Sequence, residues 1–155
     1  MEKINWSRII LGGLLAGLIM NVGEFVLNVV LFAKELEEAT RKLNLPPPGG
    51  DFIAKAVVLV FITGIVAVLV YAAIRPRFGA GPKTAVIAGV IVWLLAYVYQ
   101  GLLSAAMGMF PLSLTLIGLA WGLVEVTLAT LAGAWLYKES GPESAASHAY
   151  QERSA

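Results

Sequence analysis

The sequence predicts an all-α, polytopic membrane protein built as one bundle of four transmembrane helices. Of its 155 residues, 59% are hydrophobic and only 14% are charged, and the mean hydropathy is +0.81. Soluble domains average about 45–50% apolar and about 25% charged residues. The apolar residues fall into four blocks, each long enough to cross a bilayer core of about 30 Å. We expect helices at about 6–32, 56–74, 84–106 and 113–137.

The first block, 6–32, is longer than the apolar core of a signal peptide, which spans about 7–15 residues. We therefore interpret it as a retained transmembrane helix. Its second half carries one carboxylate and two amides, at Asn21, Glu24 and Asn28. At about 100° per residue these side chains share a stripe with Gly13 and Gly17. A membrane helix does not hold a carboxylate without a partner, so we expect this stripe to face other helices.

A charged stretch at 33–43 keeps helical spacing until the Pro46–Gly50 run, which must end a helix. We expect a solvated or interfacial helix there, with partner binding as the alternative. The second membrane helix, 56–74, leads into a basic turn at 75–83. The short link at 107–112 predicts a tight antiparallel hairpin of the last two helices.

The fourth helix repeats the pattern of small residues with one carboxylate, because Gly118, Gly122 and Glu125 share a face. Glycines at G-x-x-x-G spacing let helix backbones approach closely in lipid. Gly13 with Gly17, and Gly118 with Gly122, therefore predict that the first and fourth helices pass close together, inside one chain or across a homodimer. Composition predicts that 138–155 is a disordered cytoplasmic tail.

The candidate polar site inside the membrane comprises five side chains, Asn21, Glu24, Asn28, Gln100 and Glu125. At about 1.5 Å per residue, Glu125 lies level with Asn21 and about one helical turn from Glu24. No lysine or arginine lies in an apolar block to neutralise them, so we expect at least one carboxyl group to be protonated at neutral pH. One interpretation is a proton- or cation-handling site. The other is a structural hydrogen bond from a protonated glutamic acid to Asn21 or Gln100.

Several chemistries are excluded by residues that the chain lacks. It has no cysteine, which rules out thiolate metal sites and iron–sulfur clusters. Its one histidine, His148, lies in the polar tail, so no histidine-ligated haem is expected in the membrane. The absence of lysine from the apolar blocks rules out a retinal Schiff base. We therefore predict no cofactor, no metal site and no catalytic residues. The net charge of +1 argues neither for nor against nucleic acid, but the positive charges lie between the apolar blocks rather than in one patch, and we expect no nucleic-acid partner.

The chain resembles small four-helix inner-membrane proteins of bacteria that carry domain-of-unknown-function labels. The resemblance covers most of 5–138. It is carried by the G-G-x-x-A-G start at Gly12, by the charged extension, and by a close-set final helix pair ending Gly133-Ala134-Trp135. It implies a four-helix fold in a bacterial inner (plasma) membrane and carries over no activity or functional residues.

From these observations we expect a small integral membrane protein that acts as a non-catalytic helix-packing or accessory subunit. The alternative is a small proton- or cation-coupled transporter or channel that uses Glu24 and Glu125, as a dimer. An intramembrane enzyme ranks last, because two carboxylates without histidine or cysteine make a weak catalytic site. The expected partners are the lipid bilayer and either a second copy or a larger membrane complex.

Basic residues predict the orientation, because they are enriched in cytoplasmic loops. One side receives seven, Lys3, Arg8, Arg75, Arg77, Lys83, Lys138 and Arg153, and the other receives four, Lys34, Arg41, Lys42 and Lys55. Both termini are therefore expected in the cytoplasm. Because the chain has no native cysteine, Gly49→Cys should label from outside intact cells and Ala80→Cys should be protected. The reverse labelling pattern would invert the topology.

Overall fold

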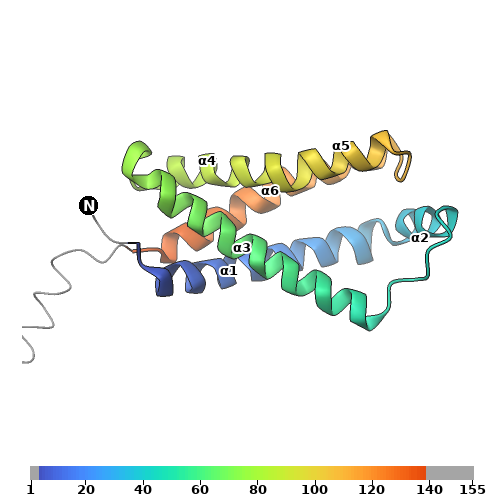
Figure 1. The fold of residues 1–155 in the computed structure, drawn as a ribbon, viewed down its shortest axis with the longest axis horizontal. Helices are drawn as coiled ribbons and strands as arrows, with labels where there is room; N and C mark the ends of the chain where they lie inside the picture. Colours follow the sequence, from blue (N-terminus) through green and yellow to red (C-terminus); the bar gives the residue numbers. More distant parts are fainter. Residues whose placement is uncertain (1–3, 139–155) are drawn as a thin grey trace, which may run out of the picture.

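A computed structural model describes residues 4–138, and within them the chain forms four long helices without strands (Figure 1). All four are long and apolar enough to cross a membrane, which confirms the predicted all-α four-helix bundle and indicates a membrane protein. The tail predicted to be disordered lies outside the described residues, apart from Lys138.

The first membrane helix consists of α1 (Trp6–Phe25) and a π-helical segment, η1 (Val26–Leu31). Phe32 leaves the helical conformation, with φ −120° and ψ 23°, and the chain restarts as α2 (Ala33–Lys42). The charged extension is therefore a separate helix, of which Ala39 is the one buried residue. It ends before the proline run, where Asn44 takes a positive φ of 52°.

The second membrane helix, α3 (Gly50–Phe78), extends beyond its predicted bounds at both ends. The predicted turn began at Arg75, but Pro76 lies inside the helix. Proline removes one N–H donor, yet the last turn is still closed by a hydrogen bond from Gly79 N to Arg75 O at 2.9 Å. The helix ends at Gly79, whose φ of +83° favours glycine.

The third membrane helix runs through α4 (Pro82–Trp93), a second π-helical segment, η2 (Leu94–Val98), and α5 (Tyr99–Ala106). A short link then leads to α6 (Leu112–Leu136). The indole N–H of Trp93 donates to the carbonyl oxygen of Leu119 at 2.8 Å and joins the two helices. The predicted antiparallel hairpin is confirmed (Figure 1).

The G-x-x-x-G pair of α1 packs against α3 rather than α6. A Cβ atom added at Gly17 would lie 2.8 Å from the Cα atom of Phe61, and one added at Gly13 would meet the backbone of Ile65. From the other side, Gly64 of α3 faces the backbone at Gly13 and Gly17. Three glycines therefore bring these two helix backbones together.

The first and fourth membrane helices do contact each other, but through glycines that the sequence pattern did not single out. Gly12 of α1 and Gly133 of α6 face one another, and a Cβ atom on either would meet the other's carbonyl oxygen. A Cβ atom at Gly122 would instead lie 2.6 Å from the ring of Tyr97 on η2. One at Gly118 would meet nothing within 4 Å, so this glycine borders open space.

The buried core cluster lies in the half of the bundle where α1 begins and α6 ends. The largest fully buried side chains all belong to α1, α3, α4 and α6; they are Ile9, Met20, Val68, Thr84, Val126 and Thr130. The segments η1, η2 and α5 bury no residue. The opposite half is therefore looser, and the candidate site lies there.

Leucine at Gly17 should separate α1 from α3, because the new side chain meets both the ring and the backbone of Phe61. We expect Gly17→Leu to lower the free energy of unfolding by about 1–3 kcal/mol. Gly118→Leu makes the same chemical change into open space and should leave stability unchanged. Thermal unfolding of both variants in detergent measures the difference. Equal stability of the two would show that the α1–α3 contact does not hold the bundle.

Candidate functional site

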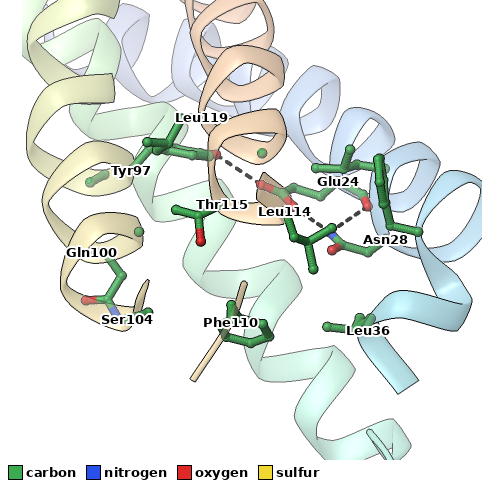
Figure 2. Close-up of a pocket in the computed structure, with 15 residues that line it drawn as sticks. Glu24, Asn28, Leu36, Tyr97, Gln100, Ser104, Phe110, Leu114, Thr115 and Leu119 are labelled. Carbon is green, nitrogen blue, oxygen red and sulfur yellow. Dashed lines mark hydrogen bonds between the residues drawn. The ribbon is translucent and has the colours of Figure 1, made fainter. Parts of the chain in front are cut away.

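Glu24 lies in the last turn of α1 and receives hydrogen bonds from two directions (Figure 2). The side-chain amide of Asn28 donates to Oε2 of Glu24 at 2.7 Å and to the Glu24 carbonyl oxygen at 2.9 Å. The hydroxyl of Tyr97 on η2 donates to Oε1 at 3.2 Å. The carboxyl group thus links the first membrane helix to the third.

Glu125 projects from the middle of α6 and is only 7% exposed. Both of its carboxyl oxygens are buried, and neither accepts a hydrogen bond from a described residue. The indole N–H of Trp121, one turn earlier, interacts with this carboxyl group without reaching hydrogen-bond geometry. A buried polar group without hydrogen bonds carries a cost of about 1–3 kcal/mol, so Glu125 is held there by its neighbours rather than by its own bonds.

Gly23 leaves the space in which the Glu125 carboxyl group packs against the first membrane helix. A Cβ atom at Gly23 would lie 2.7 Å from the carboxyl carbon of Glu125, so any larger residue would push the carboxyl group away. The neighbouring Glu24 acts electrostatically on Glu125, and both carboxyl groups act on Tyr97. The two carboxyl groups and the tyrosine hydroxyl therefore form one interacting cluster across three membrane helices.

A cavity of about 300 Å³ opens beside Glu24 in the looser half of the bundle. Its walls come from η1, η2, α5 and α6, and Leu36 of α2 and Phe110 of the last link lie on the side away from Glu24 (Figure 2). The polar lining side chains are Glu24, Asn28, Tyr97, Gln100, Ser104 and Thr115. Glu125 does not line the cavity, and its carboxyl group lies against Gly23.

Both π-helical segments border this cavity. Leu27 and Asn28 of η1 line one side, and Ala96 and Tyr97 of η2 line the other. A π-helical turn holds one residue more than an α-helical turn and is common at functional sites. Here the two segments turn Asn28 and Tyr97 toward the same carboxyl group.

Not all five predicted site residues meet. Glu24, Asn28 and Glu125 come together, and Gln100 lines the same cavity. Asn21 turns toward α3 instead, where its amide donates to the Gly17 carbonyl oxygen at 2.8 Å and to the Val57 carbonyl oxygen at 3.5 Å. The predicted hydrogen bond between a glutamic acid and Asn21 is therefore replaced by contacts to Asn28 and Tyr97.

Sequence reasoning missed Tyr97 and Gly23. The aromatic residues of the third helix were expected to serve packing or lipid anchoring. The depth of Tyr97 was the available signal, because at about 1.5 Å per residue it lies roughly 13 Å before the end of α5, close to the depth of Glu24. Gly23 offered no signal, since only the position of Glu125 shows why a side chain is excluded there.

The two carboxyl groups of the cluster have different hydrogen-bond environments. Asn28 and Tyr97 present donors to Glu24, which suits an ionised carboxylate. Glu125 accepts no hydrogen bond from a described residue, since the nearby Trp121 indole N–H misses hydrogen-bond geometry, and two adjacent like charges cannot both be ionised at low cost. Among residues 4–138, no group of three or more histidine, aspartate or glutamate side chains is placed to hold a metal ion. The chemistry available is exchange of a proton or a single cation.

Comparison of the chain with protein-family models, with curated proteins and with solved structures finds no match. Function is therefore argued from the geometry of the cluster and of the cavity beside it.

Removing the Tyr97 hydroxyl should weaken the link between the first and third membrane helices. Interhelical hydrogen bonds in membranes are worth about 0.6 kcal/mol on average and up to about 1.7 kcal/mol. We expect a loss of that size in Tyr97→Phe, and no further loss when Glu24→Ala has already removed the acceptor. Tyr99→Phe is the control, because Tyr99 is 68% exposed. Equal effects of the two phenylalanine variants on unfolding in detergent would contradict the bond.

Proposed function

We propose that this chain binds and releases protons or small cations within the membrane at the Glu24–Glu125 pair. The observation that carries this proposal is the position of the pair at a cavity. Glu24 lines the cavity, whereas the interacting Glu125 is buried next to Gly23 and accepts no hydrogen bond from a described residue. A purely structural carboxyl group needs no cavity beside it. Ionisable groups inside membrane proteins mark ion and proton pathways by default.

The pair offers two states that differ by one proton. With Glu24 ionised and Glu125 protonated, the donors of Asn28 and Tyr97 stabilise the charge. A proton or cation that enters the cavity meets Glu24 first, since Glu125 does not line the cavity. Protons or cations from the surroundings would therefore exchange at Glu24. Glu125 would influence this exchange through its electrostatic interaction with Glu24.

The packing of the bundle supports access of protons or cations to the Glu24–Glu125 pair from one end of the bundle only. The half that contains Gly12, Met20 and Val126 is closely packed, and the cavity lies in the other half. A complete path across the membrane then requires a rearrangement or a second copy, which agrees with the dimer expected for four helices. In the proposed setting, a bacterial inner membrane with both termini cytoplasmic, the cavity faces the non-cytoplasmic side.

A non-catalytic helix-packing or accessory subunit is the second candidate, and one specific contact favours it. The hydrogen bond from Tyr97 to Glu24 joins residues 73 positions apart, and such a bond locks helices in register. In that role the Glu24 carboxyl group would be a fixed connector whose proton occupancy does not follow the pH of the surroundings.

Infrared difference spectroscopy during a pH titration separates the two candidates. In the proposed function, the protonated-carboxyl band of wild-type protein in lipid should disappear as the pH rises. The band should be absent or altered in Glu24→Gln and Glu125→Gln, because glutamine keeps the shape but carries no exchangeable acid proton. Both variants should fold, since glutamine can still form the hydrogen bonds of the site.

The exposed Glu37→Gln in α2 is the matched control and should leave the titrating band unchanged. A band that is present but insensitive to pH would favour the structural connector. Two fully ionised carboxylates at pH 7 would contradict the one-proton pair and indicate a bound cation or an open aqueous path.

A further inference from the structure

The cavity beside Glu24 combines one carboxylate with walls that are mainly apolar. Leucine and phenylalanine side chains supply most of that surface, from Leu27, Phe32, Leu36, Phe110, Leu114 and Leu119. Among residues 4–138, no lysine, arginine or histidine lines the cavity. We propose that it binds an amphipathic organic cation, with a substituted ammonium group at Glu24 and an apolar group against these walls. This inference rests on the proposed function of Glu24.

The oxygen atoms that line the cavity favour binding of an organic ammonium ion over binding of a metal ion. Magnesium and calcium require six or more oxygen ligands, and the described residues present no cluster of acidic side chains around the cavity. A substituted ammonium ion carries its charge on a weakly hydrated surface and is satisfied by one carboxylate and by aromatic rings. The ring of Tyr97 lines the cavity beside Glu24 and is available for cation–π contact, whereas the ring of Phe110 lies on the far side, against the apolar group of the ligand.

The size of the cavity limits the ligand. At about 300 Å³ it lies at the lower end of small-molecule pockets, which span about 300–1,000 Å³. A compound with one aromatic ring and one ammonium group suits this volume better than a multi-ring drug. Gly118 contributes to the space, because a Cβ atom there would meet nothing within 4 Å.

A cation bound at the Glu24 carboxylate would favour loss of the proton that the pair holds at Glu125. The groups that face Glu24 are Asn28 from η1, Tyr97 from η2 and the second carboxyl group, Glu125, from α6. From α2 the cavity receives only Leu36, so no basic side chain there opposes the ligand. Binding of a permanently charged cation should therefore tighten as the pH rises and should release a proton at neutral pH.

The experiment uses benzyltrimethylammonium, which cannot lose its charge, and its uncharged carbon isostere, neopentylbenzene. Each is titrated calorimetrically into the full-length protein in lipid nanodiscs, in buffers of different ionisation enthalpy so that released protons are counted. We expect saturable binding of the cation alone, with proton release. Glu24→Gln should weaken binding by about tenfold or more, which corresponds to about 1.4 kcal/mol. Glu37→Gln should leave it unchanged.

Gly118→Leu tests the location of the site without touching the carboxylates. The leucine side chain should fill the cavity and abolish cation binding, while the pH titration of the carboxyl infrared band persists. Equal binding of neopentylbenzene, or cation binding that survives both Glu24→Gln and Gly118→Leu, would overturn the inference.

The infrared titration of the same samples separates this inference from the function on which it rests. A titrating band without cation binding would overturn the ligand class and leave proton handling intact. A protein that neither titrates nor binds the cation would overturn both.

Discussion

Where α1 meets α3 and α6, helix backbones come into direct contact at glycines, Gly64 against Gly17 and Gly133 against Gly12. In lipid there is no hydrophobic force between helices, so this close van der Waals packing supplies much of the association energy. The contacts lie in one half of the bundle. Beyond these contacts η1 and α6 no longer pack closely against each other, and both line the cavity beside Glu24.

The two carboxyl groups of the pair lie differently with respect to that cavity. Glu24 reaches the cavity and finds Asn28 and Tyr97 as donors. Glu125 stays on the packed side, where Gly23 leaves room for its carboxyl group but offers it no hydrogen bond. Two chemically identical side chains thus receive unequal surroundings within one cluster. Such inequality is how proteins assign different protonation states to like groups.

The fold was predictable because hydrophobic block length is a strong signal, and the depth of Glu24 and Glu125 could be counted along each helix. Rotation about the helix axis was harder to predict. The stripe of Gly13 and Gly17 does face a neighbour, but a periodic pattern cannot say which one, and the neighbour is α3. Asn21 lies on the same stripe as Glu24, but its side chain contacts α3. The Glu24 carboxyl group contacts the third membrane helix instead. Pro76 inside α3 shows a further limit, because a proline in a last turn costs only one donor.

The π-helical segment η1 also determines how the chain tolerates changes in length. A π-helical turn is equivalent to one residue inserted into an α-helix, and one residue corresponds to about 100° of rotation. Deleting a single residue between Val26 and Leu31 would restore a regular α-helix and leave an apolar segment still long enough to span the membrane. Everything after the deletion would turn by that angle, which would carry Phe32 and Leu36 away from the cavity. The length of η1 is therefore under a constraint that membrane insertion alone would never impose.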